Sequence, residues 1–129
     1  MSVRIGNIGF HVAFAVPNEE KDRIEKFLAT HESFMRETHH LSGTTEPLVL
    51  TYAVLRSPEF HNPLDPSSGE TGRTLYGLIE LYNGPEGAQA HMEAGMAREQ
   101  MFAELVALTG EYCVSGILGA PVIHAMKDN

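Results

Sequence analysis

Residues 74–97 read TLYGLIELYNGPEGAQAHMEAGMA, and this stretch decides the fold that the sequence predicts. Its first half, 75–82, is almost wholly apolar and β-prone, which predicts a buried strand with a single acid, Glu80, in its middle. Residues 83–85, Asn-Gly-Pro, then predict a turn and a helix start, because proline at the first helical position gives up no hydrogen bond that the helix would use.

The helix after this turn carries His91 on one face with Ala88, Met92 and Gly95, since side chains three, four and seven residues apart share a helical face. The strand and the helix therefore point a carboxylate and an imidazole toward the same interior. We expect a functional site, if the chain has one, around Glu80 and His91.

The composition favours one soluble globular domain spanning residues 1–129. Hydrophobic residues make up 43% of the chain and charged residues 20%, and the length is sufficient to bury a core. The net charge of −8, without a cluster of lysines or arginines, argues against a nucleic-acid surface or a polybasic membrane surface. A neutral, apolar or aromatic small molecule is the ligand class that this charge favours.

Cys113 is the single cysteine, so no internal disulfide can form, and its apolar surroundings favour a buried thiol over a nucleophile. No apolar run approaches the roughly 20 residues of a membrane span, and residues 1–9 lack the apolar core of a secretory signal. These features predict a cytoplasmic protein.

The periodicity of the whole chain predicts the order β-α-β-β-α-β, with the second helix doubled. Strands are expected at 8–16, 47–56, 75–82 and 111–118, and helices from 18 to about 38 and from 85 to about 109. This order is typical of an α+β domain whose four-stranded antiparallel sheet carries its helices on one face. Residues 119–121, Gly-Ala-Pro, are expected to break the last strand before a short extended tail.

Residues 57–72, rich in proline and glycine, are expected to form a long loop that acts as a lid or as an interface arm, with plain disorder as the alternative. The sheet face away from the helices also carries large apolar residues, and no segment remains to cover it. A homodimer with sheet face against sheet face is the simplest arrangement that covers it.

Two segments resemble one known family. Residues 46–57, EPLVLTYAVLRS, are similar to the second-strand segment of the antibiotic-biosynthesis-monooxygenase-like family of dimeric α/β barrels. Residues 78–92 resemble that family's third strand and following helix, where an acid is followed by an aromatic residue and then by a histidine. Glu80, Tyr82 and His91 occupy those positions.

The resemblance implies a ferredoxin-like protomer, a dimer whose two sheets form a barrel, and a ligand cavity between sheet and helices. Members of the family include cofactor-free oxygenases of polyphenolic substrates and haem-degrading enzymes. This chain departs from the haem-degrading branch, which uses a tryptophan in its site, because it contains none. Its connection at 57–72 is also longer than the usual hairpin.

His91 is the main catalytic candidate, because a neutral imidazole with an ordinary pKa of about 6.5 can take a proton from a phenol or an activated C–H bond. The alternative is a buried histidine that donates to a backbone carbonyl. Glu80 is expected to orient His91 or to act as a base itself, with a structural hydrogen bond as the alternative. The remaining candidates, expected to contact the substrate, are Tyr76, Tyr82, Tyr52, His31 and His11.

No cofactor or metal is expected. His31, His91 and Glu80 match a two-histidine, one-carboxylate iron site in residue type, but no short ligand spacing supports such a site. His39 and His40 are adjacent and diverge on a helix, so joint chelation by this pair is not expected.

The sequence thus predicts a cofactor-independent monooxygenase of a small aromatic or quinone-like compound, with His91 as the base. One alternative is a non-catalytic small-molecule-binding or structural homodimer of the same fold. A further alternative is a haem-binding or haem-degrading relative. The expected partners are a second copy of the chain and a small molecule, without nucleic acid or membrane.

Overall fold

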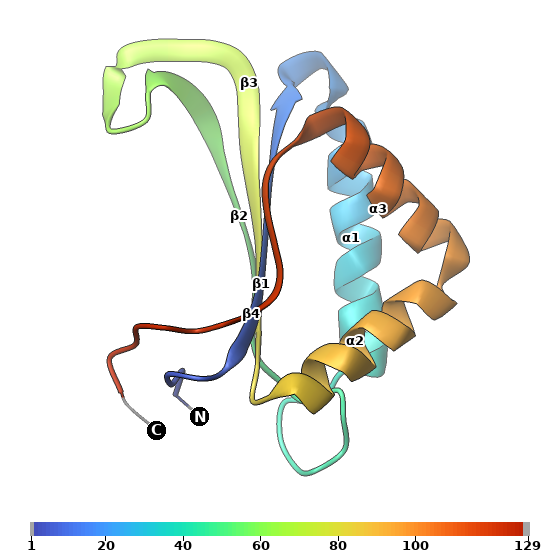
Figure 1. Cartoon of the computed structure of the whole chain (residues 1–129). Helices are drawn as coiled ribbons and strands as arrows, with labels where there is room; N and C mark the ends of the chain where they lie inside the picture. The colour runs from blue at the N-terminus through green and yellow to red at the C-terminus, as the bar shows by residue number, and fades with distance from the viewer. Residues whose placement is uncertain (1, 128–129) are drawn as a thin grey trace.

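The computed structural model describes residues 2–127 (Figure 1). Along this part of the chain the elements are β1 (Ile8–Pro17), the 3-10 helix η1 (Asn18–Glu20), α1 (Lys21–Thr38), β2 (Val49–Asn62), β3 (Asp65–Tyr82), α2 (Pro85–Ala97), α3 (Glu99–Tyr112) and β4 (Cys113–Pro121). The strands form one antiparallel sheet in the order β2-β3-β1-β4. Among residues 2–127, no helix has both the length and the apolar character needed to cross a membrane.

All three helices lie on one side of the sheet, as Figure 1 shows, so the predicted α+β class with a four-stranded antiparallel sheet is confirmed. The element order and the strand order are compatible with a ferredoxin-like arrangement. Within residues 2–127, the opposite side of the sheet carries no helix and faces away from the core.

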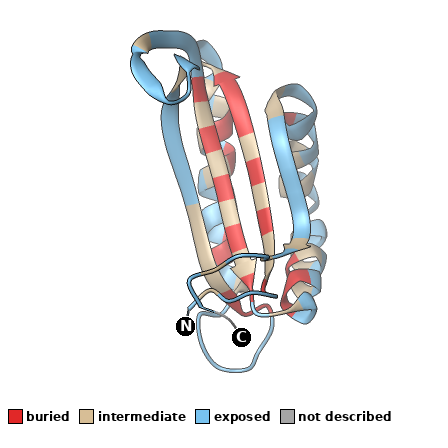
Figure 2. Ribbon diagram, turned by 60° about the vertical axis from the view of Figure 1, so that its left-hand side comes forward, coloured by how far each residue is buried: buried red, intermediate tan, exposed pale blue. Residues whose placement is uncertain are grey.

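The strand β3 shows why the sheet has two different faces. Its buried residues alternate with half-buried ones in the banded pattern of Figure 2, as the two-residue period of a strand requires. Tyr76, Leu78, Glu80 and Tyr82 point toward the helices. Glu80 therefore lies in the core because of its place in the alternation, although a carboxylate is costly to bury.

The helix α1 covers the sheet with a stripe that repeats at helical spacing. Ile24, Phe27, Phe34 and Met35 are buried on this stripe, and His31 lies in the middle of it. Apolar residues of both the sheet and α3 complete the core around this stripe. An imidazole is thus inserted into an otherwise apolar helix face and must find its hydrogen bonds inside the protein.

The expectation of a loop at residues 57–72 is wrong. β2 continues to Asn62 and β3 begins at Asp65, so this segment is a long two-stranded hairpin that curves away from the helices (Figure 1). Arg73 forms an ion pair with Glu59 on the facing strand, with 2.8 Å between Nε and Oε1. Cross-strand pairs of this kind hold the hairpin together where no core lies beneath it.

The prolines and glycines that predicted a loop are accommodated within the two strands of the hairpin. β2 is an edge strand, so Pro58 removes no ladder hydrogen bond from a further neighbour. Gly69 and Gly72 have φ angles of 92° and 95°, which glycine adopts without steric cost, and the strand register shifts in the same region. The irregular residues therefore bend the ladder without ending it.

β4 also extends further than expected. Residues 119–121 continue the strand instead of breaking it, because Gly119 takes a φ of 77° where the pairing with β1 shifts register. Val122 follows with a backbone hydrogen bond from its N–H to the carbonyl of Asn7, at 2.7 Å. The helix before it, α3, likewise runs to Tyr112, past its expected end.

The docking of α3 can be tested by truncating its one fully buried side chain. Leu108 has no exposed surface and packs in the core with Phe14 and Ile24. Leu108→Ala should lower the free energy of unfolding by about 2–5 kcal/mol, measured by urea denaturation. Val106→Ala on the same helix removes an exposed side chain and should change it by less than about 0.5 kcal/mol. Equal effects of the two variants would contradict this packing.

Candidate functional site

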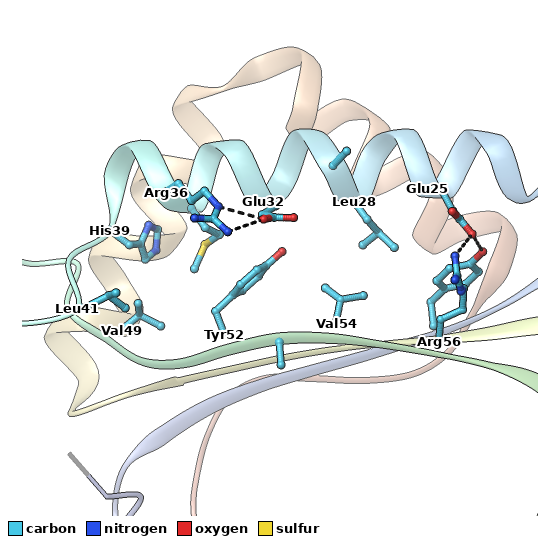
Figure 3. A pocket seen from close by; sticks show the side chains of 14 residues that line it. Glu25, Leu28, Glu32, Arg36, His39, Leu41, Val49, Tyr52, Val54 and Arg56 are labelled. Carbon is cyan, nitrogen blue, oxygen red and sulfur yellow. Dashed lines mark hydrogen bonds and ion pairs between the residues drawn. The ribbon is translucent and has the colours of Figure 1, made fainter.

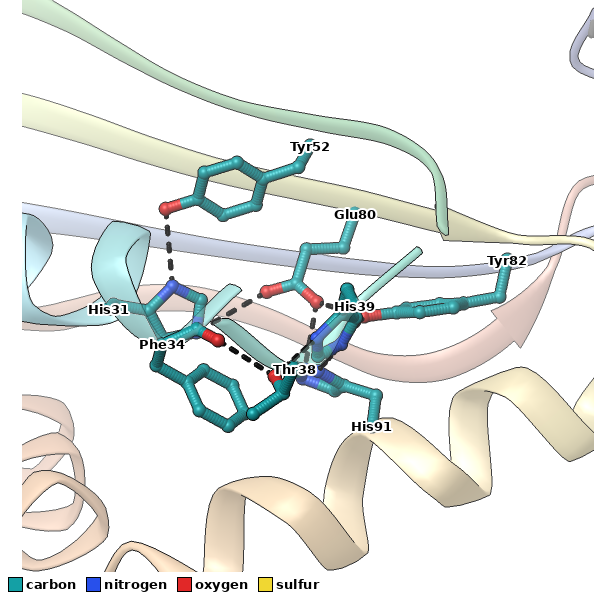
Figure 4. Close-up of polar contacts among 8 residues, drawn as sticks. All are labelled: His31, Phe34, Thr38, His39, Tyr52, Glu80, Tyr82 and His91. Atoms are coloured by element: carbon teal, nitrogen blue, oxygen red, sulfur yellow. Dashed lines mark hydrogen bonds and ion pairs between the residues drawn. The ribbon is translucent and has the colours of Figure 1, made fainter. Parts of the chain in front are cut away.

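A buried polar cluster lies between the sheet and the helices (Figure 4). Its side chains come from four elements and from the residue that follows α1: His31 from α1, His39 after its end, Tyr52 from β2, Glu80 and Tyr82 from β3, and His91 from α2. No buried side-chain nitrogen or oxygen among residues 2–127 lacks a hydrogen-bond partner. The cluster is therefore internally satisfied, as buried polar groups generally are.

Glu80 is the centre of the cluster. The Tyr82 hydroxyl donates to Oε1 at 2.7 Å, and Nε2 of His91 lies 3.1 Å from the same oxygen. Nε2 of His31 lies 3.6 Å from the other oxygen, Oε2. Only 1% of Glu80 is exposed, so its partners, rather than water, must stabilise the carboxylate.

The histidines of the cluster are linked by short contacts. The Thr38 hydroxyl donates to the carbonyl of Phe34 at 2.7 Å, and its oxygen lies 2.8 Å from Nδ1 of His39. Nε2 of His39 lies 2.9 Å from Nδ1 of His91 and 3.1 Å from the Tyr82 hydroxyl. The nitrogen that carries the proton in each imidazole therefore depends on the tautomer of its neighbour.

Nε2 of His91 and Oε1 of Glu80 lie 3.1 Å apart, and two electron pairs at this distance would repel each other. A proton or a cation must therefore lie between the two atoms. Burial raises the pKa of Glu80 to about 7, against the opposing effect of the Tyr82 hydrogen bond. Glu80 thus holds a proton at the acidic side of neutrality and can share it with His91.

The imidazoles are kept neutral. Burial lowers the pKa of His91 to about 3, with smaller contributions from the charges of His39 and His31. Burial likewise lowers the pKa values of His31 and His39 to about 4. The cluster therefore presents neutral imidazoles, which is the form that binds metals.

A cleft of about 950 Å³ opens between α1 and β2 (Figure 3). Tyr52 and His39 belong both to its wall and to the polar cluster. The Tyr52 hydroxyl lies 3.2 Å from Nδ1 of His31. The other residues that line the cleft are Glu25, Leu28, Ala29, Glu32, Met35, Arg36, Leu41, Val49, Ala53, Val54, Arg56 and Tyr76.

The structure brings most of the predicted site residues together, but not all. His31, Tyr52, Glu80, Tyr82 and His91 belong to the cluster. Of these, only Tyr52 lines the cleft, while His31, Glu80 and His91 lie behind the wall.

Two predicted residues lie elsewhere. Tyr76 lines the far end of the cleft, where its hydroxyl donates to Glu25 at 2.6 Å. His11 lies on the open face of the sheet, because it pairs with Ile79 and not with Glu80. The expectation that His11 lines the same cavity as His31 is therefore wrong, since neighbouring strand residues point to opposite faces.

His39 was missed as a member of the cluster. α1 ends at Thr38, and His39 adopts extended backbone angles, φ −103° and ψ 157°, which turn its ring back toward His91. The helix end expected near residue 38 was the sequence signal for the position of His39. A residue beyond the end of a helix does not follow the helical spacing.

Three of these residues have the arrangement of metal ligands. One nitrogen of His31, one of His91 and a carboxylate oxygen of Glu80 all lie within 4.8 Å of one another, and all three residues are buried. Two imidazoles and a carboxylate suit a divalent transition metal.

No family model, no curated protein and no solved structure matches the chain. The resemblance to antibiotic-biosynthesis monooxygenases therefore stays a prediction from the residues.

The buried histidines should make the fold sensitive to acid. Each has a lower pKa in the folded state than its ordinary 6.5, so its protonation favours unfolding, while the raised pKa of Glu80 has the opposite sign. Between pH 5 and 6, unfolding should take up roughly three protons at His31, His39 and His91 and release roughly one from Glu80. The free energy of unfolding should fall by roughly 2–3 kcal/mol for each unit of acidification in this window.

Urea denaturation of EDTA-treated protein at several pH values measures this slope. His39→Gln should reduce it, whereas the exposed His124→Gln should leave it unchanged. A stability that does not change between pH 5 and 6.5 would show that the buried imidazoles are not neutral in the folded state.

Proposed function

We propose that the chain is an enzyme that oxygenates a small aromatic or quinone-like compound bound in the cleft between α1 and β2. One observation carries the proposal: Tyr52 lines the cleft, and its hydroxyl lies 3.2 Å from Nδ1 of His31, whose other nitrogen faces Glu80. A tyrosine, a histidine and a carboxylate in this order connect the cleft with a buried proton acceptor.

The relay moves protons in two steps. The substrate hydroxyl gives its proton to the Tyr52 oxygen while Tyr52 gives its own to Nδ1 of His31. Nε2 of His31 then passes a proton to Oε2 of the ionised Glu80, 3.6 Å away, once the side chains approach. Glu80 is thus the final base and His31 passes the proton to it. His91, for which the role of base was expected, contacts Glu80 together with Tyr82 and has a positioning role.

Proton removal leaves an electron-rich phenolate that can react with dioxygen directly. For a hydroquinone, one oxygen atom enters the ring as a hydroxyl group and the ring is oxidised to the quinone. The other oxygen atom leaves as water with two hydrogens from the substrate, so the reaction needs no external reductant. The protein then has to bind, deprotonate and shield the substrate.

The walls of the cleft favour a neutral aromatic substrate. Leu28, Met35, Val49 and Val54 contribute apolar surface. The two arginines of the cleft are already paired with carboxylates, Arg36 with Glu32 and Arg56 with Glu25. Together with the net charge of −8, these pairs leave little attraction for an anion.

Removal of the Tyr52 hydroxyl tests the relay. With a panel of hydroquinones under oxygen, Tyr52→Phe should lower kcat by about 100-fold or more, the usual contribution of a general acid or base. Tyr112→Phe removes a hydroxyl that donates to Glu20, outside the cleft, and should leave kcat unchanged. Unchanged oxygen uptake by Tyr52→Phe would overturn the mechanism.

The complete satisfaction of the cluster favours a second candidate, a homodimer that binds a small aromatic molecule without transforming it. Its cluster would fix the fold and the shape of the cleft. Saturable binding of a hydroquinone, with no oxygen uptake by the wild-type protein, would favour this candidate.

We also propose that two copies associate through the open face of the sheet. On this face Ala53, Ile79, His11 and Ile117 lie side by side, one from each strand in the order β2, β3, β1, β4. The next row contains Leu55, Gly77 and Ala13. Apart from His11, and Ser115 at the β4 end of the second row, these side chains are apolar or absent, and such a surface supports close contact with a second sheet, as in a dimeric barrel.

A charge placed in the middle of this face tests the dimer. Ile79→Lys should convert the wild-type dimer to a monomer in light scattering coupled to gel filtration, because a buried unpaired charge opposes association. Val106→Lys on α3 adds the same charge on the helical side and should stay dimeric. A wild-type protein that is monomeric at high micromolar concentration would overturn this proposal.

A further inference from the structure

Glu80 is a buried carboxylate whose partners in the described part of the chain are Tyr82, His31 and His91. The two histidines are buried and no lysine or arginine takes part in these contacts. The centre therefore combines a buried carboxylate with two imidazoles whose Nε2 atoms face it. From this combination we infer that His31, Glu80 and His91 bind one divalent transition-metal ion.

The spacing of the donor atoms suits a single ion. Ligands at metal distances of about 2.1 Å lie roughly 3.0–3.5 Å from one another in octahedral or tetrahedral sites. Nε2 of His91 lies 3.1 Å from Oε1 of Glu80, and Nε2 of His31 lies 3.6 Å from Oε2. One nitrogen of His31, one nitrogen of His91 and one oxygen of Glu80 lie within 4.8 Å of one another. Small rotations of these side chains would therefore enclose an ion.

The outer hydrogen bonds support the same reading. A metal-bound histidine normally donates its second ring N–H to a neighbouring acceptor, which fixes the ring and its tautomer. Nδ1 of His91 lies 2.9 Å from Nε2 of His39, whose Nδ1 lies 2.8 Å from Thr38 Oγ1. When Nδ1 of His91 donates to His39, Nε2 of His91 has no hydrogen and is directed at the carboxylate, as a metal ligand would be.

The other two ligands are supported as well. Nδ1 of His31 lies 3.2 Å from the Tyr52 hydroxyl, which can accept its hydrogen. Tyr82 donates to Glu80 at 2.7 Å and holds the carboxylate in place. Tyr52 and His39, which contact His31 and His91, line the cleft, so the site lies directly behind these two side chains.

The donor set selects the class of metal. Two imidazoles and one carboxylate favour Fe²⁺, Co²⁺, Ni²⁺ or Zn²⁺ over Mg²⁺ and Ca²⁺, which prefer oxygen ligands. The inference does not rest on the proposed function, because binding can be measured without any substrate. A bound ion would occupy Glu80 and Nε2 of His31, so the proton relay belongs to the metal-free protein.

The experiment is a titration of tag-free, EDTA-treated protein with Co²⁺, followed by visible absorption, and with Zn²⁺, followed by calorimetry. The wild-type chain should bind one ion and show the d–d absorption of Co²⁺ with nitrogen and oxygen ligands. Glu80→Gln and His91→Gln should each weaken binding at least tenfold. His61→Gln/His124→Gln removes two exposed histidines and should bind as the wild-type chain does.

Circular dichroism shows whether each variant is folded, and a Zn²⁺-dependent rise in the melting temperature of the wild-type protein gives a readout that needs no variant. Metal binding is measured without substrate, and oxygen uptake is measured with EDTA-treated protein, so each result can fail without the other, which separates this inference from the proposed function. Absence of stoichiometric binding to the wild-type protein would overturn the inference. Equal affinities of the wild type, Glu80→Gln and His91→Gln would overturn it as well.

Discussion

The burial of the Glu80 carboxylate in an internal strand is the constraint on which the rest of the site depends. A carboxylate without water is costly unless hydrogen-bond donors or a cation surround it. Here a hydroxyl from the same strand and imidazoles from two helices meet that need, at 2.7 to 3.6 Å. α1, α2 and β3 are thus held together at one point by polar contacts inside an apolar core.

The same constraint extends from the direct partners of Glu80 to the residues that contact those partners. A proton, or a cation in its place, must lie between Glu80 and His91, because Nε2 of His91 lies 3.1 Å from Oε1 of Glu80. His39, just beyond the end of α1, contacts the other nitrogen of this histidine on α2. Tyr52 contacts His31 and also lines the cleft, so a ligand bound in the cleft would contact a residue of the cluster.

Local patterns predicted much of this structure. The alternation in β3 and the stripe of α1 predicted which residues point inward, and Glu80 and His31 follow from those two periods. His91 follows from the helical spacing of α2. The hairpin was misread because proline and glycine indicate a loop locally, whereas Arg73 and Glu59 are brought together only by pairing of distant residues. His39 was missed because its position depends on where the helix ends, not on helical spacing. His11 was misplaced because the pairing of β1 with β3 puts it beside Ile79, on the face of the sheet opposite Glu80.

The two-residue period of β3 has a consequence for how this protein can change in evolution. Residues can be inserted or deleted at the tip of the hairpin, around Pro63 and Leu64, because no buried side chain depends on their count. A single deletion between Tyr76 and Glu80 would exchange the two faces of one half of the strand. The carboxylate would then leave the interior and an isoleucine or leucine would enter it, so the length of this segment is as closely constrained as its composition.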